Sequence, residues 1–244
     1  MFTAHRLTAL GSVVALAVAA LLSRAVLRGG RPPVAPNTCE ATWSVSLGTD
    51  PEALPRALIA AGRDVWAAVT LGGDAQLVRT RDGRRHQGVQ TVRGVGAVRG
   101  WFSDAGGVHL ALGGGARVRV VTAGGGERTV AASEVPAPQA DTSALGAAVA
   151  GRDALARAVV ALDAGRVVLW TTRDGPVTTL RYRLLDARDN PAGAAGTLGE
   201  LLATPDARHA PVVAAAQAGP REAAMALATS HGPRMVQLRC GAAR

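Results

Sequence analysis

The sequence predicts an all-β fold in which a unit of short strands recurs about four times. The two clearest copies, 57–83 and 144–175, share the segments AGRD and TRDG in the same order. Looser copies begin at Val95 and Pro211, and every copy offers three short apolar runs separated by Gly, Asp or Pro. Runs of this length between turn residues are typical of strands.

A further extended segment follows each of the first three copies, at 88–93, 128–134 and 177–185. This gives four strands per unit, which is the strand content of a propeller blade. The last copy ends at Cys240 without a fourth strand, whereas the strand-like segment 42–47 stands near the start of the chain. We therefore predict a small β-propeller of about four blades, preceded by a hydrophobic helix and closed by the N-terminal strand. A degenerate fifth blade between Val177 and Pro211, a β-sandwich and an open β-repeat are the alternatives.

The only two cysteines, Cys39 and Cys240, lie at the two ends of the predicted repeat. In an antiparallel pair the start of one strand lies beside the end of its neighbour, so closure would bring the two thiols within bonding reach. We predict a disulfide between them. The alternative is two free thiols in a cytosolic protein. A structural metal site is disfavoured, because two cysteines with no neighbouring Cys or His cannot fill a tetrahedral site.

The N-terminal segment indicates export. The run 7–22 carries no charge and follows a cationic start, as in a secretory signal peptide. As a helix it would span about 24 Å, less than the roughly 30 Å of a hydrocarbon core. An uncleaved anchor that tethers the protein to the membrane through residues 7–27 is the alternative. We predict a signal or anchor at 1–30, a Pro-rich linker at 31–38 and a propeller-like domain at 39–244, located outside the cytoplasm.

The formal charge of +9 results from 27 basic and 18 acidic residues, and every basic residue is arginine. The absence of lysine excludes a Walker A phosphate loop, Schiff-base chemistry and a lysine general base. The densest basic group lacks the interleaved aromatic residues of a nucleic-acid site, so no nucleic-acid partner is expected. We expect this group to decorate an exposed loop, with some affinity for anionic polysaccharide or lipid headgroups; it comprises Arg79, Arg81, Arg84, Arg85 and His86.

Signals for catalysis, metal binding and cofactors are weak. The chain has no GxSxG or HExxH motif, and its histidines are scattered at His5, His86, His109, His209 and His231. We expect His109 to be a satisfied strand residue. The segment with Asp186, Asp189 and Asn190 lacks the alternating ligand spacing of a calcium loop and favours a polar turn. Core packing is the expectation for Trp66, Trp101 and Trp170, and no cofactor is predicted.

The run VVLWTTRDGPVTTLRYRLLDARDNPAG, followed by APVVAAA, resembles exported, high-GC bacterial β-propeller proteins of myxobacterial type. The TRDG turns at Asp82 and Asp174 faintly resemble the Asp-box of sialidase-like propellers, but the Thr-Trp that completes the box is missing. A sialidase mechanism would need Tyr182 as nucleophile, and we place this residue in an outer fourth strand, which is the wrong position for a central pocket. Its flanking arginines and possible carboxylate partners are Arg181, Arg183, Glu134 and Glu200.

The sequence thus favours an exported, non-catalytic binding or scaffold module of the cell envelope, with a protein or glycan partner. A sialidase-like, carbohydrate-active hydrolase is the alternative.

Overall fold

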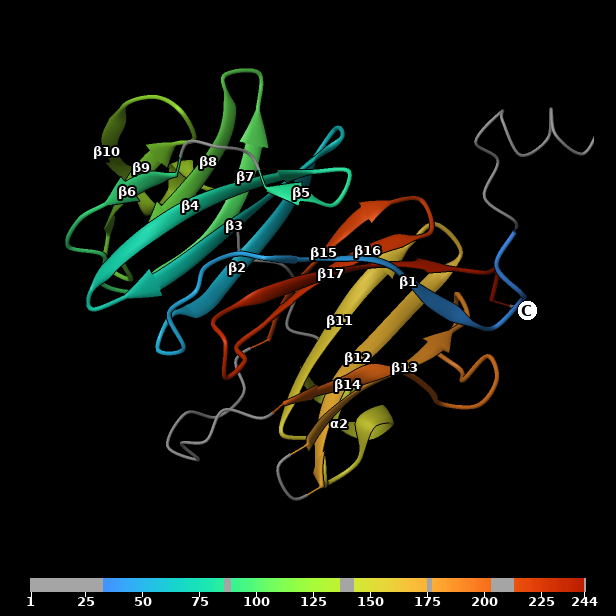
Figure 1. Ribbon diagram of the computed structural model, residues 1–244. Coiled ribbons are helices and arrows are strands. Elements are labelled where there is room, and N and C mark those ends of the chain that lie inside the picture. The colour runs from blue at the N-terminus through green and yellow to red at the C-terminus, as the bar shows by residue number, and fades with distance from the viewer. Residues whose placement is uncertain (1–32, 86–88, 137–142, 175–176, 203–212, 244) are drawn as a thin grey trace, which may run out of the picture. The chain divides into compact units, whose positions relative to one another are not determined.

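The computed structural model describes residues 33–85, 89–136, 143–174, 177–202 and 213–243, and these form four antiparallel sheets (Figure 1). The predicted leader at 1–30 lies outside the described residues. In the described part of the chain, no helix is both long and apolar enough to cross a membrane. The predicted all-β fold and its four sheets are confirmed.

The sheets are numbered in chain order. Sheet 1 contains β2 (Leu54–Ala61), β3 (Asp64–Leu71) and β4 (Asp74–Arg81), and β4 also pairs with the short strands β5 (Arg84–Arg85) and β6 (Gln90–Val92). Sheet 2 contains β7 (Val98–Asp104), β8 (Gly107–Leu112), β9 (Arg117–Thr122) and β10 (Glu127–Ala131), followed by the 3₁₀ turn η1 (Ala132–Glu134).

Sheet 3 is preceded by the helix α2 (Ser143–Ala150) and contains β11 (Ala156–Leu162), β12 (Gly165–Asp174), β13 (Val177–Leu185) and β14 (Gly196–Leu202). Sheet 4 contains β15 (Val213–Gly219), β16 (Glu222–Leu227), β17 (Arg234–Cys240) and β1 (Cys39–Ser46). Within each sheet the consecutive strands form an antiparallel meander, which is the arrangement within a propeller blade, and in sheet 4 the strand β1 adds to its edge.

The N-terminal strand completes the last sheet, as predicted. In Figure 1 the blue strand β1 runs beside the red strand β17, and the register pairs Cys39 with Cys240. The two cysteines form a disulfide across a sequence separation of 201. The described part of the predicted Pro-rich linker is held to the C-terminal residues, since the amide of Asn37 donates to the carbonyl of Ala242 at 3.0 Å.

The third copy of the repeat is displaced by one strand from its predicted alignment. Residues 143–150 form the helix α2, where the repeat predicted a first strand. Its sequence, SALGAAVA, is rich in alanine, which has the highest helix propensity. Leu145 and Val149 of this helix pack against the core around Trp170 of sheet 3.

This displacement corrects four further expectations. The segment AGRD forms a hairpin turn after β2 but ends a helix in the third copy, and the second TRDG begins within the end of β12, the second strand of its sheet. The segment 177–185 is the third strand of sheet 3 and lies between β12 and β14, so it is not an outer strand. A fifth blade between Val177 and Pro211 is not formed by the described residues, because 177–202 supplies β13 and β14 of sheet 3.

Apolar layers join neighbouring sheets through their first strands. Strand β15 contacts both β2 and β11, and β2 contacts β7, so sheets 2, 1, 4 and 3 follow one another in that order. The side chains between them are mostly Ala, Val, Leu and Met, as the aromatic content of 3% predicts. Leu110 and Leu77, for example, are fully buried between sheets 2 and 1. The first strands therefore lie where the sheets converge.

Candidate functional site

A hollow of about 240 Å³ lies where the first strands of sheets 1, 2 and 4 converge. We call it the arginine pocket, because two arginines, Arg56 of β2 and Arg99 of β7, line it. The remaining lining residues are Ala57, Leu58, Gly100, Trp101, Phe102, Ala111, Val135, Pro136, Ala214 and Ala215. No lining residue carries a negative charge, so the described wall of the pocket is cationic and apolar.

Both arginines are the extra residue of a β-bulge. In sheet 1 the register passes from Pro55↔Val69 to Ala57↔Ala68, which leaves Arg56 without a partner on β3. In sheet 2 it passes from Val98↔Leu112 to Gly100↔Ala111, which leaves Arg99 without a partner on β8. A bulge interrupts the alternation of the strand and redirects the extra side chain, and bulges are frequent beside functional sites. Two independent bulges thus direct arginines to one pocket.

The two guanidinium groups differ in how they are held. Nε of Arg56 donates to the hydroxyl of Thr70 at 3.0 Å, which fixes the side chain and leaves its terminal nitrogens for another acceptor. Among the described residues, the guanidinium of Arg99 makes no hydrogen bond or ion pair. A second hollow, of about 610 Å³, adjoins the first and shares Arg56 with it. The pocket therefore contains one guanidinium whose orientation is fixed, that of Arg56, and one that can still bind a ligand, that of Arg99.

The aromatic wall of the pocket, formed by Trp101 and Phe102, is held in place by contacts outside the pocket. The indole Nε1 of Trp101 donates to the carbonyl of Ala57 at 3.2 Å. Trp101 also contacts Trp66 of β3, with ring centroids 6.4 Å apart and planes at 46°. Phe102, next to Trp101 on β7, stacks on His109 with centroids 5.0 Å apart. The expectation of core packing holds for Trp170, which is buried, whereas Trp101 is half-buried and lines the pocket.

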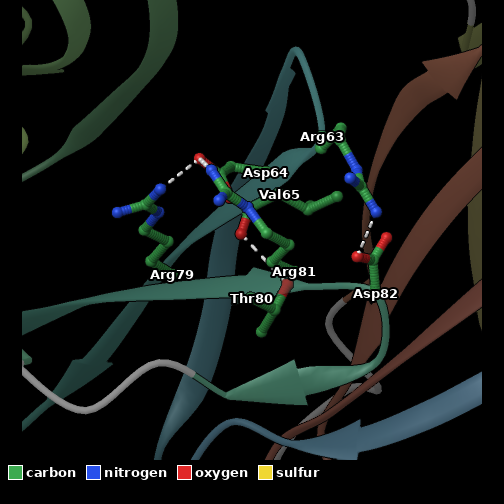
Figure 2. Close-up of polar contacts among 7 residues, drawn as sticks. All are labelled: Arg63, Asp64, Val65, Arg79, Thr80, Arg81 and Asp82. Carbon is green, nitrogen blue, oxygen red and sulfur yellow. Dashed lines mark hydrogen bonds and ion pairs between the residues drawn. The ribbon is translucent and has the colours of Figure 1, made fainter.

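A network of arginines and carboxylates extends from this wall along sheet 1. The guanidinium of Arg79 lies over the ring of Trp66, 5.7 Å from its centroid. Figure 2 shows Arg79 and Arg81 of β4 directed toward Asp64 at the start of β3. Asp64 accepts one hydrogen bond from Arg79 at 2.6 Å and two from Arg81, at 2.6 and 2.8 Å. The carboxylate is thus shared between two guanidinium groups.

This arrangement sets the protonation of Asp64. Burial alone would raise the pKa of Asp64, but the hydrogen bonds from Arg81 and Arg79 outweigh it and hold the pKa below its usual value of 3.8. The neighbouring pair, Arg63 and Asp82 at 2.6 Å, is exposed to solvent (Figure 2). The ionised Asp64 therefore compensates part of the charge of the strand.

The basic group predicted from sequence is accordingly divided. Arg79 and Arg81 bind Asp64 within the sheet, whereas Arg84 and Arg85 form the exposed strand β5. His86 lies outside the described residues. Part of the group is therefore structural, which sequence spacing did not reveal because Asp64 is distant along the chain.

His109 is a satisfied strand residue, as predicted. It is 3% exposed; its Nε2 lies 2.8 Å from Oδ1 of Asp104, and its Nδ1 lies 3.0 Å from the hydroxyl of Thr122. The hydrogen bonds from His109 and from the amide of Gly106 hold the pKa of Asp104 below its usual value. His231 lies in a turn. His5 and His209 lie outside the described residues.

Among the described side chains, those that a sialidase mechanism would need are not brought together. Tyr182 lies on the third strand of sheet 3, is 6% exposed, and packs against Gly196 of β14. The flanking Arg181 and Arg183 point to the opposite face of β13, because side chains alternate along a strand. Glu134 is exposed after sheet 2, where its side chain accepts a hydrogen bond from the amide of Ala131 at 2.9 Å.

The other predicted carboxylate features are turn elements. The carboxylate of Asp186 accepts hydrogen bonds from the amides of Arg188 and Asn190, at 2.8 and 2.9 Å, and Asp189 pairs with Arg166. These amide bonds lower the pKa of Asp186. Among the described residues, no group of His, Cys, Asp and Glu could hold a metal ion. The side chains of Asp174 and Glu200 lie outside the described part of the structure.

Comparisons with known proteins add little. No family model and no curated protein matches the chain. Among solved structures, it is similar to the WD40 domain of coronin from Toxoplasma gondii, with 11% identity and a TM-score of 0.28. The match covers 84% of this chain but only 62% of that one. The fold assignment therefore depends on the sheet topology itself, and the resemblance to exported high-GC bacterial propeller proteins stays a prediction.

Proposed function

We propose that the protein is an exported, non-catalytic binding module of the cell envelope, built as a four-bladed propeller, with the arginine pocket as its recognition site. The observation that carries this proposal is the convergence of two bulged arginines and an oriented tryptophan at the first strands. A propeller is a rigid scaffold whose centre and loops present ligand-binding groups. A binding role needs no more chemistry than the pocket provides.

The propeller arrangement is supported by how the sheets follow one another. Three of the four junctions of a closed ring are formed by apolar layers, between sheets 2 and 1, 1 and 4, and 4 and 3. Sheet 2 also carries a second apolar cluster that includes Ala111 and Val135, and sheet 3 carries one beneath α2. Sheets with an apolar layer on both faces are expected in a ring of blades.

Export is supported by the leader-like segment together with the disulfide. Disulfides persist in oxidising compartments and are rare in the cytosol. Mass spectrometry of protein purified from its native host, without reductant, would test this proposal. We expect a mass two hydrogens below that of the dithiol form, together with either an N-terminus created by cleavage or an intact leader in the membrane fraction. Finding the protein in the cytosol with both thiols free would refute export.

Binding is favoured over hydrolysis by the position of Tyr182. A sialidase-type nucleophile must reach the substrate, whereas Tyr182 is held in the core against Gly196. The arginines of the pocket belong to other sheets, β2 of sheet 1 and β7 of sheet 2. The pocket can therefore hold a ligand but contains no group from the predicted catalytic set.

The test is a binding panel combined with product analysis. The purified protein is titrated against neutral and acidic envelope oligosaccharides, acidic and basic peptides, and anionic lipid vesicles. We expect saturable binding of at least one class, loss of that binding in the Arg56→Gln/Arg99→Gln double variant, and chemically unchanged ligand by chromatography. Cleavage of the bound ligand, or binding that the double variant leaves intact for every class, would refute the proposal.

A further inference from the structure

The charge of the arginine pocket distinguishes it from the other arginine contacts of the chain. Arg79, Arg81 and Arg119 each pair with a carboxylate of the protein. Arg56 and Arg99 instead line a hollow in which no lining residue is acidic. Two guanidinium groups facing one concave site attract an anion, and the attraction is stronger in a cleft than on an open surface. The ligand is therefore expected to be an anion.

The geometry of Arg56 favours a planar oxyanion. Its Nε is occupied by Thr70, so the two terminal nitrogens remain to face an acceptor. Two parallel N–H groups match the two oxygens of a carboxylate in a bidentate contact. The guanidinium of Arg99 makes no hydrogen bond or ion pair with the described residues and can supply a further hydrogen bond. Because both arginines are bulge residues, substituting them removes no ladder partner and should leave the sheets intact.

The aromatic wall and the volume limit the rest of the ligand. Nε1 of Trp101 is already bound to Ala57, so the indole offers an apolar ring surface and no hydrogen bond. The hollow of about 240 Å³ is smaller than the roughly 300 Å³ at which pockets for drug-sized ligands begin. It therefore has room for one compact ring, whose less polar C–H face can lie on Trp101.

We infer that the arginine pocket binds a uronate residue: a sugar ring whose carboxylate contacts Arg56 and Arg99 and whose C–H face lies on Trp101. This inference rests on the proposed binding function, because it names the ligand class of the same site. A carboxylate on a pyranose ring matches all three features of the pocket. Its negative charge complements the arginines, its two oxygens fit the planar guanidinium fork, and the flat face of its ring fits the indole of Trp101. Outside the cytoplasm, such residues occur as free sugars and as units of acidic polysaccharides.

The experiment compares uronates with matched neutral sugars by calorimetry and tryptophan fluorescence on the full-length mature protein. The probes are glucuronate and galacturonate, glucose and galactose, and short uronate oligosaccharides, together with glucose 6-phosphate and an acidic peptide. We expect uronates to bind at least about ten-fold more tightly than the neutral sugars, with affinity that falls as salt is added. Tighter binding of the oligosaccharides than of the free uronates would identify a polysaccharide source, and equal binding a free sugar.

The variants test the assigned contacts. Arg56→Gln and Arg99→Gln should each weaken uronate binding by about ten-fold or more, and Arg56→Lys should restore only part of it, because lysine lacks the fork. The matched control is Arg157→Gln, since Arg157 is the second residue of β11, as Arg99 is of β7, but is exposed and does not line the pocket. The affinity of the Arg157→Gln variant for uronate should equal that of the wild type. Melting curves of all variants verify that they fold.

Three outcomes would overturn the inference: equal affinity for neutral sugars, unchanged uronate binding in both folded glutamine variants, or pocket-dependent binding of the peptide or the phosphosugar in place of uronate. The third outcome would leave the proposed binding function intact, because a ligand of another class would occupy the same pocket. Pocket-independent binding of every member of the panel would instead refute the proposed function as well.

Discussion

Loss of the Cys39–Cys240 disulfide should destabilise the fold more than a typical single substitution, which costs about 0.5–3 kcal/mol. The bond joins residues separated by 201 positions, so it constrains nearly the whole described chain in the unfolded state. In the chain-entropy model a loop of this length corresponds to about 18 cal/mol/K, or about 5 kcal/mol at 25 °C. For a domain of this size each kcal/mol changes Tm by about 2–4 °C, so the expected decrease is about 10–20 °C.

The structure also indicates where the loss would first appear. Strand β1 is an edge strand whose only neighbour in its sheet is β17, and the disulfide joins the two at Cys39 and Cys240. Without the bond, β1 is held by its ladder, by side-chain bonds to β17 such as the Glu40–Arg239 ion pair, and by packing, of which Trp43 against Gly83 is one contact. Amides of β1 should therefore exchange faster with solvent than those of β16, which has a partner on each side.

The assay is urea unfolding followed by tryptophan fluorescence. The oxidised wild type is compared with the Cys39→Ser/Cys240→Ser double variant, which avoids the intermolecular pairing of a single thiol. Reductant should lower the stability of the wild type to that of the variant and leave the variant unchanged. If the double variant unfolds within about 1 kcal/mol of the oxidised wild type, the reasoning from loop length is wrong.

Three further predictions concern sheet 1. Asp64→Asn should cost about 1.5–3 kcal/mol in thermal or urea unfolding, because it leaves two arginines without their shared carboxylate. Asp82→Asn, at an exposed pair, should cost less than about 1 kcal/mol, and equal losses would contradict this account. Because the folded pKa of Asp64 lies below its usual 3.8, its contribution should be complete above about pH 4 and be lost as pH falls through the folded pKa. The gap between wild type and Asp64→Asn should therefore shrink in acid, and a constant gap from about pH 7 to about pH 2.5 would exclude this linkage. Gly83→Ala should cost about 1–3 kcal/mol more than Gly62→Ala, since both glycines have positive φ but only at Gly83 would a Cβ meet Trp43, at 2.8 Å. Similar melting temperatures for these two variants would show that Trp43 can move aside for the added Cβ at no cost in stability.

The completion of the last sheet by the N-terminal strand could be predicted because it follows from counting strands. The last copy lacks a strand, the start of the chain offers one, and Cys39 and Cys240 mark the two ends. The displacement of the third copy could not be predicted from repeated words alone. An Ala-rich run such as 144–150 is compatible with a helix or a strand, and the segment AGRD suits either kind of turn.

The functional residues show a similar division. The separation of Tyr182 from Arg181 and Arg183 could be predicted, because side chains that are neighbours along a strand point to opposite faces of the sheet. The arginine pocket could not be predicted from the sequence. A bulge depends on the register between two strands, and neither strand's own sequence reveals that register. Arg56 and Arg99 therefore resemble ordinary surface arginines until the pairing of β2 and β7 is known.

The position of β1 in the last sheet has a consequence for biogenesis. Strand β1 is made before the other strands of the described chain but reaches its final neighbour last, since β17 must be made before β1 can dock. Until then a β-competent edge and a reactive thiol stay uncovered, and both invite pairing with other chains. Oxidative maturation should therefore be post-translational, and its yield should depend on chaperones that protect the waiting N-terminal stretch.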